Sequence, residues 1–319
     1  MRYIVRSFGS VFISASFLCW GSLPALSHPL SAAVQGASSF REQSAEHDMA
    51  GAKSFLYVGD EALNAIYAYE SRPSGEVLQY TLSSGIAQPR LMKIGNHGDL
   101  FVANYGATDI LRFHGNSPPI VYDDSAGDPV DVAMCPDGTL YVADFVTAGG
   151  TGDVRVYDPG RIKSTRVLSF DGMWFPTAVS CDEHSNVYVG TQPQIFKYAK
   201  NGRGGGRELP MRIGGLGGLV LSRSGDIVVT DYYSIQGGFQ GDIEFYHQND
   251  AAPYKEILIP GTNQNGEGLA LTSSGKDVWV AVGSVASYEF SVSSGDLEYT
   301  IPAPTGASFW GIAAEPENL

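Results

Sequence analysis

The sequence repeats one short phrase six times, at intervals of 40 to 51 residues. GTLYVADF begins at Gly138, and the similar GDLFVANY begins 40 residues earlier, at Gly98. The six copies are FLYVGD (55–60), DLFVAN (99–104), TLYVAD (139–144), NVYVGT (186–191), DIVVTD (226–231) and DVWVAV (277–282). Each copy is rich in β-branched and aromatic residues, which is typical of a short strand. A fixed period of this length indicates an array of similar β units.

Each copy of the phrase is the second of four predicted strands. An apolar segment and a polar turn precede it, as in PVDVAMCPDG (129–138), and a third strand such as DVRVYD (153–158) follows it. A fourth, more polar segment such as TRVLSF (165–170) completes the unit. Helical periodicity is not evident in this region. Four antiparallel strands per repeat form one blade of a β-propeller.

The two ends of the repeat region are each incomplete. FLYVGD has no first strand before it, and FWGIAAEPEN (309–318) is a first strand with no second strand after it. We therefore predict an all-β, six-bladed propeller of four-stranded antiparallel blades. Its ring closes by pairing of the N- and C-terminal strands, which removes free strand edges. A seven-bladed ring with one unrecognised blade is the alternative.

The N-terminal segment has the features of a secretion signal. Two arginines precede an uncharged apolar run from Phe8 to Leu23, and small residues near Ser27 offer a cleavage site. The run is shorter than the ~20 residues that a membrane span requires. We predict a signal peptide at 1–27, a flexible leader at 28–53 and the propeller at 54–319. The mature chain would then be a secreted or periplasmic monomer without a membrane span.

The charge of the chain excludes some classes of partner. The formal net charge is −14, from 34 acidic and 20 basic residues, so phosphate backbones and anionic membranes are repelled. We expect no nucleic-acid partner, whereas a cation or a neutral ligand remains compatible. Beyond the signal segment the cysteines are Cys135 and Cys181, whose spacing does not suit zinc. We expect two buried, unpaired thiols, although an exported chain permits a disulfide.

LYVAD followed by VRVYDPG, together with LFVANYGATDILRF, resembles the NHL and YVTN-type repeats of secreted bacterial propellers. The resemblance covers residues 55–319. Relatives include streptogramin lyases, gluconolactonase-like proteins and binding propellers without catalytic activity. The resemblance implies the fold, but function lies in sites added to a shared fold.

Carboxylates gather where the predicted second strands end and the next first strands begin. In a propeller these loops share one face, over the mouth of the central channel. Oxygen ligands there suit Ca²⁺ or another divalent cation, and the gluconolactonase-like resemblance implies such a metal. The candidate ligands are Asp131, Asp144, Asp231 and Glu267. The alternative is that Asp and Asn at these positions cap the strands and initiate turns.

Histidine is placed unfavourably for catalysis at the mouth. Beyond the leader the histidines are His97, His114, His184 and His247, all in turns or strand ends expected at the opposite face. A histidine general base at the mouth is therefore not expected, which departs from the streptogramin lyase pattern. Since no nucleophile elbow or comparable arrangement is present either, we assign no catalytic residue.

Aromatic residues are the most suggestive feature of the mouth-side loops. Beside Asn, Gln and Asp, they suit a small organic molecule, a sugar or a peptide. The alternative is that several simply pack between blades. The candidate ligand-binding residues are Tyr105, Phe145, Trp174, Phe175, Tyr232, Tyr233 and Trp310.

These observations favour an exported binding or interaction module with its ligand site at the channel mouth. Its partner would be a small organic molecule, a sugar, a peptide or another protein. The alternative is a metal-dependent hydrolase or lactonase, and a streptogramin-type lyase is less favoured. A structural protein with a closed mouth is a third hypothesis.

Overall fold

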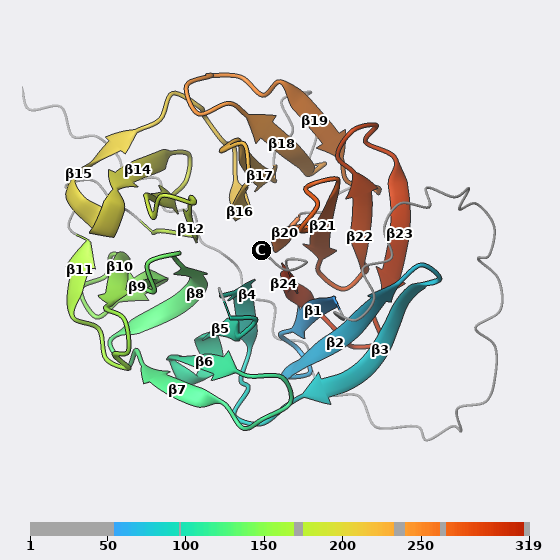
Figure 1. Cartoon of the computed structure of the whole chain (residues 1–319), viewed down its shortest axis with the longest axis horizontal. Helices are drawn as coiled ribbons and strands as arrows, with labels where there is room; N and C mark the ends of the chain where they lie inside the picture. Colours follow the sequence, from blue (N-terminus) through green and yellow to red (C-terminus); the bar gives the residue numbers. More distant parts are fainter. Residues whose placement is uncertain (1–53, 96, 169–174, 233–239, 262–265, 316–319) are drawn as a thin grey trace, which may run out of the picture. The chain divides into compact units, whose positions relative to one another are not determined.

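Six four-stranded antiparallel sheets surround one axis (Figure 1). They are seen in a computed structural model that describes residues 54–95, 97–168, 175–232, 240–261 and 266–315. The predicted six-bladed all-β propeller is confirmed. The predicted signal peptide and leader lie outside the described residues.

The blades are numbered here in chain order, each from its innermost to its outermost strand. Blade 1 contains β24 (Phe309–Ala314), β1 (Phe55–Asp60), β2 (Ala65–Arg72) and β3 (Gly75–Leu82). Blade 2 contains β4 (Pro89–Ile94), β5 (Leu100–Asn104), β6 (Asp109–Phe113) and β7 (Ile120–Asp123). Blade 3 contains β8 (Gly127–Met134), β9 (Leu140–Thr147), β10 (Asp153–Tyr157) and β11 (Arg166–Leu168).

The remaining blades follow the same order. Blade 4 contains β12 (Ala178–Cys181), β13 (Val187–Gly190), β14 (Ile195–Ala199) and β15 (Arg203–Glu208). Blade 5 contains β16 (Leu216–Leu221), β17 (Ile227–Asp231), β18 (Asp242–Tyr246) and β19 (Lys255–Leu258). Blade 6 contains β20 (Leu269–Leu271), β21 (Asp277–Val282), β22 (Ala286–Ser291) and β23 (Leu297–Pro302). Two 3₁₀ helices, η1 (Tyr105–Ala107) and η2 (Lys200–Gly202), lie in loops.

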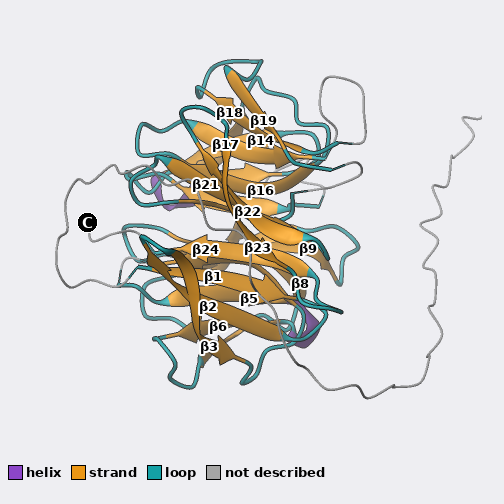
Figure 2. Cartoon of the chain, turned by 90° about the vertical axis from the view of Figure 1, so that its right-hand side faces the viewer, coloured by secondary structure: helices purple, strands orange, loops and turns teal. Residues whose placement is uncertain are grey.

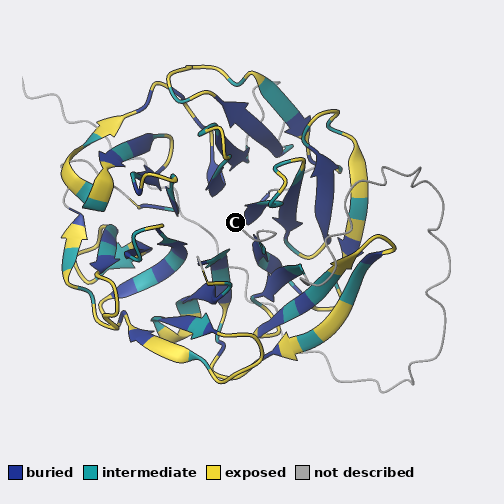
Figure 3. Ribbon diagram, in the orientation of Figure 1, coloured by how far each residue is buried: buried dark blue, intermediate teal, exposed yellow. Residues whose placement is uncertain are grey.

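Burial decreases from the axis to the rim, as Figure 3 shows. Every residue of the second strand β17 is buried, whereas most residues of the outer strand β15 are exposed. A second strand packs against neighbouring blades on both faces, so its sequence is almost continuously apolar. This packing explains why the repeated phrase was the clearest signal in the sequence.

The ring closes between the ends of the folded chain. β24 pairs antiparallel with β1, with Tyr57 opposite Ala313. The amide of Glu315 donates to the carbonyl of Phe55 at 2.7 Å, and the Glu315 carboxylate accepts from the Phe55 amide at 3.1 Å. Blade 1 is therefore built from both ends of the sequence, as predicted.

The expectation of unpaired thiols was wrong. Cys135, just after β8, and Cys181, at the end of β12, form a disulfide with a Cα–Cα distance of 5.4 Å. The two cysteines lie at the ends of neighbouring first strands, as the repeat pattern indicated, and there they are close enough to bond. The bond ties blade 3 to blade 4.

The loops collect on the two faces of the ring (Figure 2). Each first strand starts at one face and runs towards the other, and each second strand returns to the face where the first one started. The loops between second and third strands share this face with the connections between blades. No helix in the described part of the chain has the length and hydrophobicity of a bilayer-spanning segment.

We predict that ending the chain after Ser308 destroys the cooperative fold. The truncation removes β24, leaves one edge of β1 unpaired and opens the ring. Thermal unfolding followed by circular dichroism should show a large loss of stability. A chain ending after Glu315 should melt like the full chain, and an unchanged melt for the shorter chain would refute the closure argument.

Removing the disulfide should cost about 2–4 kcal/mol of unfolding free energy, because it closes a loop with a sequence separation of 46. The double variant Cys135→Ala/Cys181→Ala tests this by urea denaturation, compared with the oxidised protein. Adding dithiothreitol should lower the stability of the natural chain and leave the double variant unchanged. An equal effect of the reductant on both proteins would contradict the assignment.

Candidate functional site

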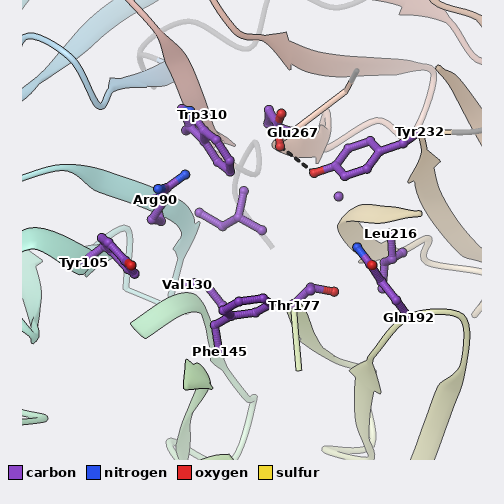
Figure 4. A pocket seen from close by; sticks show the side chains of 12 residues that line it. Arg90, Tyr105, Val130, Phe145, Thr177, Gln192, Leu216, Tyr232, Glu267 and Trp310 are labelled. Atoms are coloured by element: carbon purple, nitrogen blue, oxygen red, sulfur yellow. Dashed lines mark hydrogen bonds between the residues drawn. The ribbon is translucent and has the colours of Figure 1, made fainter. Parts of the chain in front are cut away.

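A pocket of about 240 Å³ lies at the mouth of the central channel. Its walls come from the starts of first strands and the ends of second strands (Figure 4). These are the loops that the sequence placed together on one face. The lining residues are Arg90, Leu91, Tyr105, Val130, Phe145, Thr177, Gln192, Leu216, Gly217, Tyr232, Glu267 and Trp310.

Five of the residues proposed from the sequence line this pocket. They are Tyr105, Phe145, Tyr232, Trp310 and Glu267. Phe175 lies beside the pocket and packs on Phe145, with the ring centroids 5.2 Å apart. Trp174 and Tyr233 lie outside the described residues.

Arg90 is held in an aromatic frame at one side of the pocket. Its guanidinium carbon lies 3.7 Å from the ring centroid of Trp310 and 4.8 Å from that of Tyr105. The guanidinium also pairs with Glu61 at 2.9 Å. Cation–π contacts and the ion pair together fix the side chain and the rings around it. Arg90 is not among the site residues expected from the sequence, although its place at the start of a first strand was available as a signal.

Glu267 and Tyr232 form a second polar group across the pocket from Tyr105 (Figure 4). The Tyr232 hydroxyl donates to the Glu267 carboxylate at 2.5 Å. Burial raises the pKa of Glu267, while this hydrogen bond and, more weakly, the Arg90 charge oppose the rise. The remaining walls include the apolar side chains of Leu91, Val130 and Leu216, which the sequence analysis also missed.

Lys93 crosses the channel further along β4 than Leu91. Its ammonium donates to the carbonyl of Leu219 at 3.2 Å, which joins blade 2 to blade 5 on the opposite side of the ring. Surrounding protein lowers the pKa of Lys93 by desolvation. This bridge obstructs the channel beyond the pocket.

Asp131, one of the proposed metal ligands, is fully buried near this bridge. Its carboxylate accepts hydrogen bonds from the amides of Val132 and Val179, each at 2.8 Å. Burial raises the pKa of Asp131 to about 6, and the Lys93 charge opposes the rise. The carboxylate therefore ties blade 3 to blade 4.

Polar side chains at the ends of second strands bind the backbone just before the first strand of the same blade. Asp60 accepts from the Ser308 amide at 2.9 Å, and the Asn104 side chain accepts from the Ala87 amide at 2.7 Å. Asp231 accepts from the amides of two consecutive glycines before β16, at 2.6 and 2.8 Å. The last residue of the repeated phrase thus has a backbone-binding role in these three blades.

Asp144 occupies the same position in blade 3 but has different partners. Arg155 donates to its carboxylate at 2.8 Å, and Asp124 lies beside it. Burial and then the Asp124 carboxyl raise the pKa of Asp144 to about 10. The Tyr157 hydroxyl donates to Asp124 at 2.6 Å, so this cluster joins β10 to the connection between blades 2 and 3.

The four proposed metal ligands do not converge. Within the described ranges, no group of three or more His, Cys, Asp or Glu side chains is arranged to hold a metal ion. Of the four, Glu267 alone lines the mouth pocket. Ca²⁺ binding therefore remains a sequence prediction without a ligand set in this part of the chain.

None of the four histidines in the described ranges lines the mouth pocket. His114 and His247 instead bond to Asp99 and Asp226, each at 2.8 Å.

Blade 5 carries a buried acidic pair where blade 3 carries an arginine. From the pairing of second and third strands, Asp242 and Glu244 of β18 occupy the positions that Asp153 and Arg155 occupy in β10. Both Asp242 carboxylate oxygens and one of Glu244 are buried without a hydrogen-bond partner in the described structure. Burial is the largest cause that raises the pKa of Asp242 to about 8 and that of Glu244 to about 7. Acidic neighbours, including Asp231, add to both shifts.

We predict that the Glu244→Gln variant unfolds at a higher temperature than the natural chain at pH 8.5. Both carboxyl pKa values are higher in the folded state than in the unfolded state. At pH values between the two, the folded state therefore binds more protons than the unfolded state. The pair consequently destabilises the fold as the pH rises from about 4 to 8. The gain should be about 1–3 kcal/mol at pH 8.5 and small at pH 5. Glu183→Gln, which removes one negative charge at an exposed turn of blade 4, is the charge-matched control. An equal gain at both pH values would contradict the account.

No protein-family model matches the sequence, and neither does any curated protein. Solved structures do match the fold. A chain of the nidogen/laminin complex superposes with a TM-score of 0.65 at 16% identity, over 83% of this chain and 99% of that one. A protein of unknown function from Bacteroides caccae gives a TM-score of 0.60 at 13% identity, over 83% of this chain and 100% of its own. At these identities the likeness is one of fold, a six-bladed propeller.

Proposed function

We propose that the chain is an exported binding propeller that recognises its partner at the mouth pocket. The main observation behind this proposal is that four aromatic residues and two charged residues line one cavity. The aromatic residues are Tyr105, Phe145, Tyr232 and Trp310. Concave sites with apolar walls and few polar groups are typical binding sites.

The size of the pocket favours a protruding group of a larger partner. Its volume of about 240 Å³ lies below the ~300–1,000 Å³ of ordinary small-molecule sites. A single inserted side chain surrounded by flatter contacts is a common arrangement in protein interfaces. The similar structure of nidogen with laminin shows a chain of this fold in a protein–protein complex. We therefore favour a protein or peptide partner over a sugar or a free metabolite.

The binding hypothesis is favoured over the metal-dependent hydrolase for a chemical reason. Asp131 and Asp231 are bonded to backbone amides, and Asp144 is bonded to Arg155. None of these carboxylates is directed to the pocket, whereas the aromatic residues are.

Filling the pocket should abolish binding and leave the fold intact. Thr177 lines the pocket and is partly exposed, so Thr177→Phe should occupy the cavity with little change in thermal unfolding. The matched control is Thr300→Phe on the exposed outer strand β23. A library of short displayed peptides, selected on the natural protein, supplies the ligands.

Selected peptides should lose at least about tenfold in affinity for Thr177→Phe and none for Thr300→Phe. Peptides that bind both variants like the natural protein would place recognition elsewhere. A selection that yields no peptide able to bind the natural protein would count against a peptide-binding mouth.

A further inference from the structure

The two charged residues that line the mouth pocket are not paired with each other. Arg90 and Glu267 are the charged residues among its twelve lining residues. Arg90 is already paired with Glu61 at 2.9 Å. Glu267 accepts one hydrogen bond from a neutral phenol, and no basic group of the described chain lies within ion-pair distance of it. The pocket therefore contains one carboxylate without an ion-pair contact in the described chain.

The aromatic walls of the pocket suit a positive charge. The rings of Trp310 and Tyr105 already bind one guanidinium, that of Arg90, at 3.7 and 4.8 Å. The ring of Phe145 lies on the same cavity, and the Tyr232 ring is fixed beside Glu267 by its hydroxyl. Aromatic faces beside a carboxylate stabilise an ammonium or a guanidinium and its apolar stem together.

The surroundings of the pocket add to this preference. Asp60 and Asp231 lie at strand ends on the mouth side, and the chain as a whole has a formal charge of −14. Basic side chains close to the mouth already have hydrogen-bond partners within the chain, since Arg155 bonds Asp144 and Lys93 bonds a backbone carbonyl. A field of this sign concentrates cations at the mouth and speeds their association.

We propose that the mouth pocket binds one basic side chain of a protein partner, a lysine or an arginine, with Glu267 as its counter-ion. This inference rests on the proposed function and names the chemistry of the inserted group. The stem of that side chain packs on Leu91, Val130 and Phe145, and its charged end reaches the carboxylate. The charge of Arg90 competes with the ligand and does not assist it.

Three small probes that share a benzene ring separate the effect of charge from that of the ring. Benzylamine, benzyl alcohol and benzoate share a ring and carry a positive, a neutral and a negative group. Isothermal titration of the full chain should give benzylamine an affinity about tenfold above benzyl alcohol, with benzoate weakest. Glu267→Gln should remove the preference for benzylamine. Glu183→Gln, a change of equal charge at an exposed turn away from the pocket, should keep it.

A second pair of ligands tests the source of the basic group. A five-residue glycine peptide with one central lysine and an acetylated N-terminus should bind, and the same peptide with acetylated lysine should bind at least about tenfold more weakly. Benzylamine binding without any binding of the lysine peptide would overturn the assignment to a protein side chain in favour of a free organic amine.

The outcomes distinguish this inference from the proposed function. If the three benzyl probes bind equally, and Thr177→Phe abolishes all three, the pocket is a binding site and the charge assignment is wrong. Stronger binding of benzoate than of benzylamine also overturns it. If none of the probes and neither peptide binds, both the inference and the mouth-binding function fail.

Discussion

Pairing of β24 with β1 joins the two ends of the propeller, and the geometry of the mouth depends on it. The closing strand places Trp310 beside Arg90, which comes from the next blade. Without that strand the aromatic frame around Arg90 would lose one of its two rings, and the pocket would lose one wall. The stability of the fold and the shape of the candidate site therefore depend on the same interaction.

The blade architecture could be predicted because each blade repeats one pattern of burial. Second strands pack on both faces, so six nearly apolar phrases of similar spacing are visible in the sequence without any structure. The closure also followed, since one strand was missing at each end. The disulfide did not follow, because the pattern places Cys135 and Cys181 in neighbouring first strands but does not tell how closely their side chains approach.

The site was predictable in part for the same reason. Loop positions at one face could be read from strand order, which brought Tyr105, Phe145, Tyr232, Trp310 and Glu267 into consideration together. The orientation of individual carboxylates could not be read in this way. Asp131 and Asp231 occupy the mouth side of their blades, yet they bind backbone amides, a role that depends on the neighbouring segment.

Blades 3 and 5 show how one scaffold position can carry opposite charge. Arg155 neutralises buried carboxylates in blade 3, whereas Glu244 at the corresponding position adds another acid in blade 5. Burial of acids without a base costs stability unless they take up protons. The buried pair of blade 5 therefore becomes negatively charged only as the pH rises through about 7 to 8.

Methyl-labelled protein titrated with benzylamine would test the central claim most directly. The account predicts that the methyl resonances of Leu91, Val130 and Leu216, on the pocket walls, shift together with one dissociation constant. Methyls on the exposed outer strands, such as those of Leu78 and Leu258, should not move. Shifts confined to the outer strands, or pocket methyls that do not respond while the amine binds, would contradict recognition at the mouth.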